Sequence, residues 1–234
     1  MDERYHPAGL VDRLAEACGG RQALAPSASV RHYSGMAQTE DDRLRTTTSV
    51  VYVDHPDWVH DLVDRAAIYR DDVAKMRLAI AVARANVVHG TGGPFGAAIY
   101  ERDSGRLVAV GMNSVVRLNN SALHGEMVAF MMAQREVGTF SLSAPGLPVH
   151  ELFTSCEPCA MCLGATLWSG VKRLVYGAGR EDATMLDFDE GPVFPESYEY
   201  LEDRGIEIVR DVLRDEARAV LELYRAKNGK IYNG

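Results

Sequence analysis

The stretch His124–Glu126 (HGE), followed further along the chain by Pro158–Cys162 (PCAMC), decides how the rest of the sequence is interpreted. One imidazole and two thiolates are ligands that zinc favours, and three protein ligands with one open position distinguish a catalytic zinc site from a structural one. A water in that open position has its pKa lowered toward ~7. Glu126 is suited to carry the proton of this water. The sequence therefore predicts a catalytic zinc bound by His124, Cys159 and Cys162, with Glu126 beside it.

Both parts of this pattern are expected at the first turn of a helix. Residues two apart on a regular helix point ~200° away from each other, so His124 and Glu126 face one site only where a helix begins. Pro158 is tolerated in a first turn, and thiolates there are stabilised by the partial positive charge of the helix end. We therefore expect two helices, one from His124 to Gly138 and one ending near Gly170, to direct their N-termini at one metal ion.

The combination of H-x-E with P-C-x-x-C resembles the signature of the zinc-dependent nucleobase deaminases. Over residues 72–234 the chain is similar to the cytidine/deoxycytidylate deaminase superfamily, and both halves of the motif are intact. The stretch 154–165 (TSCEPCAMCLGA) looks most like the guanine deaminases, with the tRNA adenosine deaminases close behind. The resemblance implies a cytidine deaminase-like fold, one zinc ion per chain, a nucleobase or nucleoside substrate and a homodimer.

The resemblance also assigns candidate substrate contacts before and at the first motif. Asn113 stands where the purine deaminases have a substrate-binding Asn, whose amide offers a donor and an acceptor to a purine edge; a turn residue is the alternative. Phe95, at the entry to a strand, is either a pocket wall or a core residue. Gly125 replaces the Ala that these families usually carry, and its N–H would hold a ring carbonyl. The missing methyl group would also widen the pocket.

Three further candidates lie closer to the C-terminus. Trp168 resembles the pocket aromatic of the guanine deaminases, with burial in the core as the alternative. Asp189 matches the first Asp of their Gly-Phe-Asp-Asp segment, in which Asp187 here replaces the glycine; a charged surface loop is the alternative. Tyr232 resembles a terminal aromatic that reaches over a pocket of its own chain or of a partner, although chain ends are often loose.

A binding protein with a structural zinc would be a different class of function. A single C-x-x-C can also be a redox pair or half of a zinc knuckle. Outside residues 156–162 the sequence contains no further C-x-x-C, and Cys18 is far from the pair in the chain. A structural site has no use for an acid, so Glu126 favours the catalytic interpretation.

Composition and charge limit the compartment and the partners. The 234 residues are 47% hydrophobic, enough for a full core, and only four cysteines are present, which makes no disulfide framework. No apolar run reaches the ~20 residues of a membrane span, and the N-terminus lacks a secretion signal, so we expect a cytoplasmic protein without a membrane partner. A net charge of −8 without a basic stretch weighs against a nucleic acid substrate.

The order of the predicted elements gives the fold class. We expect residues 57–234 to form the deaminase domain and residues 1–56 to be an extension, whether an active-site cap, a dimerisation arm or a plain extension. A first hairpin followed by helix-connected, parallel strands predicts an α/β fold of three layers, α/β/α, with a mixed five-stranded sheet. The expected strands span 93–100, 107–112, 149–154, 171–176 and 206–209. One long helix or two abutting ones are expected over 57–89 and a last helix over 213–227, with an acidic loop at 182–195.

These observations together predict a zinc aminohydrolase that converts an amino-substituted purine to its oxo form and releases ammonia. A guanine-like base or its nucleoside is the expected substrate, because the Asp189 carboxylate and the Asn113 amide would together supply an acceptor and donors to its edges. A tRNA adenosine and a cytosine or cytidine substrate are the alternatives.

Overall fold

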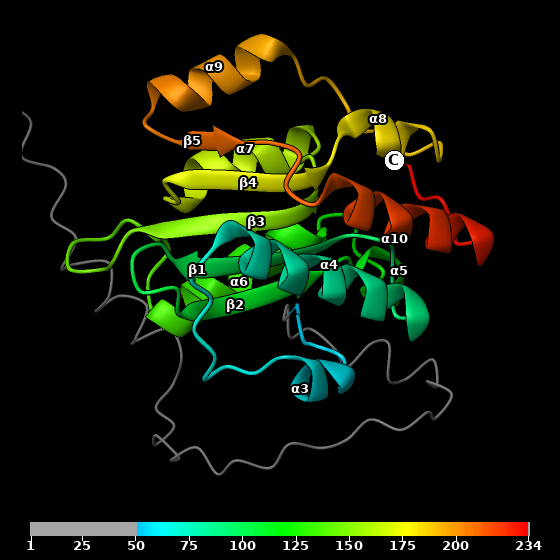
Figure 1. Cartoon of the computed structure of the whole chain (residues 1–234), viewed down its shortest axis with the longest axis horizontal. Coiled ribbons are helices and arrows are strands. Elements are labelled where there is room, and N and C mark those ends of the chain that lie inside the picture. The colour runs from blue at the N-terminus through cyan, green and yellow to red at the C-terminus, as the bar shows by residue number, and fades with distance from the viewer. Residues whose placement is uncertain (1–50, 234) are drawn as a thin grey trace, which may run out of the picture. The chain divides into compact units, whose positions relative to one another are not determined.

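The computed structural model describes residues 51–233 (Figure 1). The domain extension expected over residues 1–56 therefore lies almost wholly outside the described residues. In chain order the elements are α3 (Trp58–Leu62), α4 (Asp72–Val88), β1 (Gly96–Glu101), β2 (Leu107–Met112), α5 (Val115–Leu118), α6 (Gly125–Val137), β3 (His150–Cys156), α7 (Ala160–Ser169), β4 (Arg173–Ala178), α8 (Arg180–Thr184), α9 (Pro195–Asp203), β5 (Glu207–Val209) and α10 (Arg214–Ala226).

One mixed sheet of five strands organises the described domain, in the order β2-β1-β3-β4-β5. β1 runs antiparallel to both β2 and β3, while β3, β4 and β5 are parallel to one another. The hairpin of β1 and β2 needs only a short turn, whereas each parallel pair is joined through helices, as parallel strands require. The prediction of a mixed five-stranded α/β fold is confirmed.

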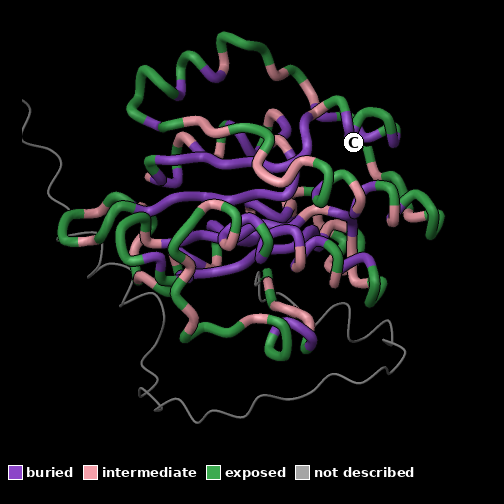
Figure 2. Tube along the Cα trace, in the orientation of Figure 1, coloured by how far each residue is buried: buried purple, intermediate pink, exposed green. Residues whose placement is uncertain are grey.

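Side chains alternate between two cores along each strand, because successive residues of a strand point to opposite faces. Ala98 and Tyr100 of β1 enter a core beneath α4 and α10, whereas Ala97 and Ile99 enter a second core beneath α6 and α7. Strands β1 to β4 are accordingly buried along nearly their whole length, whereas the edge strand β5 is partly exposed and the helices alternate between buried and exposed residues (Figure 2). This arrangement is the predicted layering of helices on both faces of the sheet.

Of the two arrangements expected over 57–89, one long helix or two abutting ones, the structure has two helices, α3 and α4, which residues 63–71 separate. Between them the Asp64 carboxylate accepts a hydrogen bond from the N–H of Ala66, and the Asp71 carboxylate caps α4 at the N–H of Ala74. An aspartate that bonds to nearby backbone stabilises turns and helix starts in preference to a continuous helix. The three- and four-residue apolar spacing over 57–89 continues through residues 63–71, so it does not indicate the break that these aspartates create.

Two short helices, α8 and α9, border the segment expected to be an acidic loop. The side chain of Asp182 accepts a hydrogen bond from the N–H of Gly179 at 2.9 Å, which closes the first turn of α8. α9 begins at Pro195, whose fixed φ suits the first position of a helix. Local capping chemistry therefore gives this stretch more regular structure than its charge suggested.

The segment before α3 is attached to the edge strand β2 and to α5. The Nε2 atom of His55 lies 3.0 Å from the carbonyl oxygen of Val110, and Arg117 donates to the Asp54 carboxylate at 2.8 Å. The His55 ring thus bonds to a carbonyl group that the edge strand would otherwise present to solvent, and the Asp54 carboxylate pairs with the charge of Arg117. Over residues 51–233, the helices are all too short or too polar to cross a lipid bilayer.

A buried cluster of charges links α4 to the middle of the sheet. The Lys75 ammonium bonds to the Glu151 carboxylate, with side-chain exposures of 5% and 1%, and Arg173 donates to the same carboxylate at 3.0 Å. The ammonium also lies 5.7 Å from the centre of the Tyr100 ring. Such a cluster is stable only while every member has its partner, since an uncompensated buried charge is costly.

We predict that Lys75→Ala lowers the free energy of unfolding by about 3–5 kcal/mol, because Glu151 would keep only one of its two cationic partners. Arg77→Ala is a matched control on the same helix, since Arg77 pairs with Glu216 at 3.6 Å on the surface. That control should lose less than about 1 kcal/mol. Urea unfolding followed by circular dichroism measures the free energy of unfolding of both variants. Equal losses would show that the buried cluster stabilises the fold no more than the surface ion pair does.

Candidate active site

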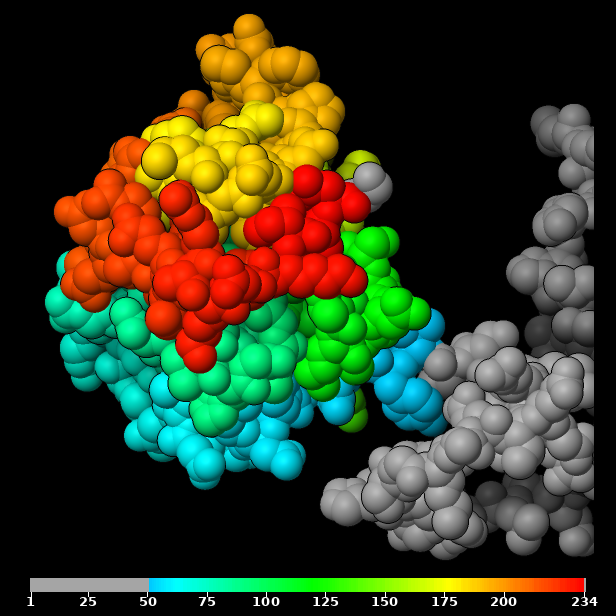
Figure 3. Space-filling view, turned by 90° about the vertical axis from the view of Figure 1, so that its right-hand side faces the viewer, coloured from blue at the N-terminus to red at the C-terminus, as the bar shows by residue number. Residues whose placement is uncertain are grey.

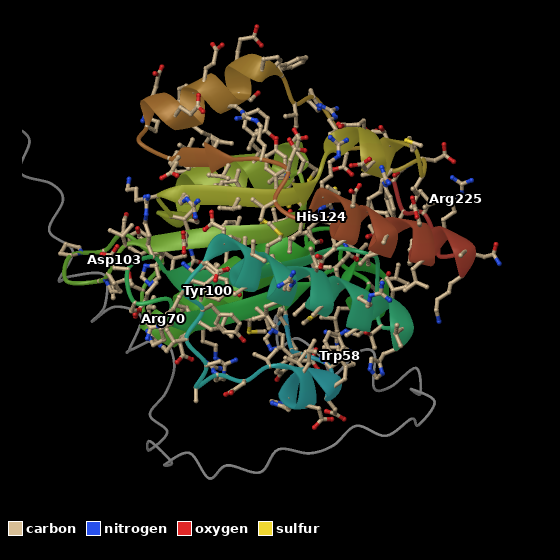
Figure 4. All side chains as sticks on the ribbon, in the orientation of Figure 1. Trp58, Arg70, Tyr100, Asp103, His124 and Arg225 are labelled. Atoms are coloured by element: carbon tan, nitrogen blue, oxygen red, sulfur yellow. The ribbon has the colours of Figure 1, made fainter. Side chains whose placement is uncertain are left out.

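The three predicted metal ligands meet where two helices begin. His124 is the N-cap of α6 and Cys159 the N-cap of α7, both with extended backbone, and Cys162 follows in the first turn of α7. The ligand atoms of the three residues all lie within 4.8 Å of one another, and the Sγ atom of Cys159 lies 3.4 Å from Nδ1 of His124. Figure 4 shows His124 in the interior, close to where β3 and β4 end. The expectation of two helix N-termini directed at one point is confirmed.

This set of atoms fits a zinc ion. Bonds of ~2.3 Å to sulfur and ~2.0 Å to nitrogen in a tetrahedron place the ligand atoms ~3.5 Å apart, in keeping with the observed spacing. A hydrogen bond with Cys162, followed by the one with His124, lowers the pKa of the Cys159 thiol to about 4. Cys159 is therefore a thiolate, the form that binds metals. Cys156 is buried apart from the three, with its thiol directed at the carbonyl of Gly179.

Glu126 lies beside the ligands in the first turn of α6. One carboxylate oxygen, Oε1, accepts a hydrogen bond from the Thr154 hydroxyl at 2.9 Å, and the other, Oε2, lies 3.4 Å from the Cys162 sulfur. Only 5% of the residue is exposed, and burial raises the pKa of this carboxyl. Thr154 on β3 thus fixes one oxygen and leaves the second turned toward the metal position. Thr154 was expected only as the end of the strand before the cysteine motif, and the sequence motifs assign it no role.

Three aromatic rings form a wall of the pocket in front of these groups. The rings of Phe95 and Phe188 meet edge to face at 5.0 Å, and Phe188 and Tyr232 do so at 5.3 Å. Phe95, Phe188 and Tyr232 line one cavity with His124, Glu126, Glu157, Cys159, Asp189 and Glu190, and the space that it encloses is about 30 Å³. Phe95 and Tyr232 were expected here, whereas Phe188 was not.

The acidic segment places Glu190, rather than Asp189, on the inside. Burial alternates along this segment, with Leu186, Phe188 and Glu190 buried and Asp187 and Asp189 exposed. The Asp189 carboxylate accepts a hydrogen bond from the N–H of Gly191 at 2.9 Å. Burial, and then the negative charges of Cys159 and Glu126, raise the pKa of Glu190 to about 8.

Glu190 is the residue that sequence reasoning missed. The signal was available in the alternation of apolar and acidic residues, because Leu186 and Phe188 predict that the next residue on their side, Glu190, also points inward. The resemblance to the Gly-Phe-Asp-Asp segment of the guanine deaminases pointed to Asp189 as the substrate contact instead. Asp189 does line the opening of the cavity, but its carboxylate is at the surface.

Asn113 is completely buried one residue after β2. Its N–H donates to the carbonyl of Phe95 at 2.9 Å, and its own carbonyl accepts from the Asn86 side chain at 2.9 Å. The side-chain oxygen lies 3.4 Å from the N–H groups of Gly93 and Val115, while the side-chain nitrogen has no hydrogen-bond partner among residues 51–233. A buried donor without a partner is uncommon, and ligand-binding sites are where such groups are found.

The structure differs from the expectation for the missing methyl group of Gly125 and for the side chain of Trp168. A Cβ on Gly125 would lie 3.2 Å from the carbonyl oxygen of Phe95, so the absent methyl group relieves packing against the entry of β1 and does not widen the pocket. Trp168 is 81% exposed on α7 and does not line the cavity of its own chain. Its place on the outward face of α7 could be fixed only by the packing of that helix on the sheet.

Comparison with known proteins agrees with this geometry. Residues 70–178 match the family described as the cytidine and deoxycytidylate deaminase zinc-binding region. The chain is 36% identical over 131 residues to a guanine deaminase of Bacillus subtilis, covering 56% of this chain and 80% of that protein. It is 29% identical over 128 residues to a tRNA-specific adenosine deaminase of Buchnera aphidicola, covering 55% and 77% of the two proteins.

Solved structures give the same family. A guanine deaminase from Nitrosomonas europaea is 41% identical with a TM-score of 0.72, over 76% of this chain and 97% of that one. A structure in complex with 2,6-diaminopurine is 43% identical with a TM-score of 0.74, over 79% and 97% of the two chains. From its fold, its metal-binding residues and these similarities, the chain belongs to the cytidine and deoxycytidylate deaminase family of zinc-dependent aminohydrolases.

Proposed function

We propose that the protein deaminates guanine or a closely related purine. The observation that carries the proposal is a pair of buried carboxylates, Glu126 and Glu190, that line an aromatic-walled cavity beside the predicted zinc ligands. Flat aromatic walls suit a planar base. The proposal is supported by the similarity to guanine deaminases and to structures that contain 2,6-diaminopurine and 8-azaguanine.

His124, Cys159 and Cys162 would hold the zinc, which would supply a water of lowered pKa, near ~7. Glu126 would accept the first proton through Oε2, while the Thr154 hydroxyl holds Oε1 in place, and would pass it to a ring nitrogen. It would then take the second proton, from the hydroxyl group now on the ring carbon, and give it to the leaving amine. A carbon–oxygen bond forms, the carbon–nitrogen bond of the amine breaks, and the products are the oxo purine and ammonia.

Recognition of the ring is assigned to buried polar groups that line the site or lie beside it. Within the described part of the chain, the Asn113 side-chain nitrogen and the Tyr232 hydroxyl are both buried without a hydrogen bond. Glu190 offers a carboxyl group to the ring N–H and amine edge of guanine, the role that the sequence had suggested for Asp189. Phe95 packs against the ring, and the N–H of Gly125, at the start of α6, is proposed to hold a ring carbonyl.

A tRNA adenosine is the weaker candidate. Tyr232 closes the cavity, so the polynucleotide would have to displace the C-terminal segment. The net charge of −8 also opposes binding to phosphates. A cytosine would leave part of the wall formed by Phe188 and Tyr232 without contact.

The zinc-loaded protein should release ammonia from guanine with a kcat/KM at least about a hundredfold above that for cytosine, cytidine or a tRNA anticodon stem-loop, since each pocket contact of this kind is worth about 1–3 kcal/mol. A coupled ammonia assay over this panel, with guanosine and 2,6-diaminopurine included, decides the substrate class. Turnover confined to the stem-loop or to the pyrimidines would refute the purine proposal.

Glu126→Gln should lower kcat by several orders of magnitude and leave zinc content unchanged, because the ligands stay in place while the proton carrier is lost. Thr154→Val is the companion variant, which keeps the carboxylate but frees its Oε1 atom. It should lose about 10- to 100-fold, the cost of a misplaced catalytic group. A Glu126→Gln enzyme within tenfold of wild type would mean that another group carries the proton.

Glu190→Gln should reduce kcat/KM for guanine by at least about a hundredfold, whereas Asp189→Asn should reduce it by less than about fivefold. The first change replaces a buried acceptor that meets the substrate, and the second alters an exposed carboxylate that bonds to Gly191. The two variants make the same carboxyl-to-amide change at adjacent positions and so control for each other. The opposite order of effects would return the role to Asp189.

We further propose that the protein is a cytoplasmic homodimer. Large apolar side chains are exposed around the outer face of the α6 and α7 layer, with Trp168 81% and Phe140 87% exposed and Met131 and Met161 over one third exposed. The Leu142 N–H donates to the Ser169 carbonyl at 2.8 Å, which brings the segment after α6 to the end of α7. Exposed aromatics of this kind mark surfaces that bind another protein.

Trp168→Glu should convert the dimer to a monomer by placing a charge at the centre of this face. Met185→Glu is the control, because Met185 is 69% exposed on α8, a different element. Analytical ultracentrifugation at micromolar concentration distinguishes the two states. Dimers of equal stability for both variants would exclude the α7 face as the interface.

A further inference from the structure

Glu190 reaches the cavity from a connecting segment that has no regular secondary structure. Between the end of α8 at Thr184 and the start of α9 at Pro195, the chain contains neither helix nor strand. Figure 3 shows the yellow residues around 180–190 lying between the orange residues of α9 and the red C-terminal residues. Because no ladder of backbone hydrogen bonds sets the position of Glu190, individual contacts must do so.

The backbone of Glu190 is joined directly to the first turn of α7. Its carbonyl oxygen accepts a hydrogen bond from the N–H of Ala160 at 2.9 Å, and Ala160 follows the metal-binding residue Cys159. The next residue, Gly191, passes so close that an added Cβ would lie 3.1 Å from the Cβ of Ala160. This contact fixes one point of the segment, but it does not set the direction in which the Glu190 side chain leaves the backbone.

The guanidinium group of Arg180 provides a second attachment for the same segment. Its Nη1 atom donates to the carbonyl oxygen of Val193 at 2.7 Å, and its Nη2 atom donates to the carbonyl oxygen of Gly191. These two carbonyl groups lie on either side of Pro192, which has no N–H group to donate. A guanidinium holds its donors in a rigid plane, so this one side chain fixes the two carbonyl groups relative to each other.

Arg180 is itself fixed beside the cysteine motif. Its N–H donates to Oε2 of Glu157 at 2.9 Å, and Oε1 of Glu157 accepts from the Tyr198 hydroxyl at 2.6 Å. Glu157 precedes Cys159 by two residues, so both attachments of the segment lead back to the start of α7. Arg180 therefore relates the position of Glu190 to that of the metal-binding residues.

We propose that Arg180 is a positioning residue that directs the Glu190 carboxyl group toward the purine. Its guanidinium holds residues 191–193 in place, and this fixes the direction of the Glu190 side chain. The proposal rests on the proposed function in that Glu190 is taken to contact the substrate. It goes beyond that function because Arg180 does not line the cavity and acts through Glu190 alone.

The size of the expected effect follows from the charge of the donor. Hydrogen bonds from an ionised group are stronger than neutral ones, and the loss of one shifts an equilibrium by a factor of about 10 to 150. Arg180 is only partly buried, so in its absence water can bond to the two carbonyl groups. We therefore expect a loss near the lower end of this range.

The first test compares Arg180→Ala with Arg204→Ala in the zinc-loaded protein. Arg180→Ala keeps the N–H that bonds to Glu157 and removes only the guanidinium. Arg204 is a matched control at the end of α9, because it is exposed and its guanidinium bonds to the Tyr200 hydroxyl at 2.7 Å. Arg180→Ala should lower kcat/KM for guanine at least about tenfold, whereas Arg204→Ala should stay within about twofold of wild type.

A conservative variant separates the contact from the charge. Arg180→Lys keeps the positive charge, but an ammonium is a compact point charge without the planar fork that bonds to two carbonyl groups. Its kcat/KM for guanine should remain at least about threefold below that of wild type. Full activity in Arg180→Lys would overturn the proposed role of the two-carbonyl contact.

A double-mutant cycle tests whether Arg180 acts through Glu190. In a Glu190→Gln background, Arg180→Ala should lower kcat/KM by less than about twofold, because the group that it positions is already lost. A general loss of structure would instead lower kcat/KM by the same factor in both backgrounds. Equal factors would therefore overturn the proposal.

Hydrogen–deuterium exchange supplies the readout that does not depend on turnover. The Gly191 N–H bonds to the Asp189 carboxylate and the Val193 N–H to the Gly191 carbonyl, so both report on this segment. In Arg180→Ala their peptide should exchange at least about fivefold faster than in wild type or Arg204→Ala, while the α6 peptides stay unchanged. Unchanged exchange in this peptide would show that Arg180 does not hold the segment.

The kinetic and exchange results separate the two proposals. If wild type releases no ammonia from guanine, the proposed function fails, and the exchange measurement alone decides whether Arg180 holds the segment. If guanine is a substrate but Arg180→Ala matches Arg204→Ala in kcat/KM, the proposed function stands and the positioning role is wrong.

Discussion

The site depends on one constraint, which is that two helices must begin at the same point. α6 and α7 carry the metal-binding residues at their first turns, so a shift of either helix along its axis would separate His124 from the two cysteines. The position of α6 is set by direct contact with the sheet. A Cβ on Gly111 of β2 would lie 2.1 Å from the carbonyl oxygen of Gly125, so only glycine allows the helix to approach this closely. α7 follows directly from β3, whose register with β1 and β4 fixes its start.

The lining of the cavity is supplied by two kinds of element. Glu126 and Thr154 lie on a helix and the central part of the sheet, where packing holds side chains in place. Glu190 and Phe188 come from the segment between α8 and α9, and Tyr232 follows α10. The groups nearest the metal-binding residues are therefore positioned by the sheet and its helices, whereas part of the aromatic wall is supplied by connecting segments.

Much of this could be predicted from the sequence, and the exceptions have physical causes. The bounds of β2 and α6 were predicted closely, because an apolar run after a hairpin turn and a glycine after a helix are local signals. Two helices over 57–89 were one of the expected arrangements, but their separation by residues 63–71 was not expected, since an apolar spacing continues across it while aspartates bond to the backbone there. The three ligands were found by spacing alone. The inward position of Glu190 follows from the alternation of buried and exposed residues after Leu186, whereas the exposure of Trp168 depends on how α7 packs against the sheet, which no local motif encodes.

The central claim is that one imidazole and two thiolates, brought together by the two helix starts, bind a single zinc with an open fourth position. Zinc K-edge X-ray absorption of the zinc-loaded protein measures this coordination directly. The account predicts one zinc per chain with two sulfur atoms at ~2.3 Å and two lighter atoms at ~2.0–2.1 Å, one from His124 and one from water. Four sulfur neighbours, or a shell of oxygen and nitrogen without sulfur, would contradict it.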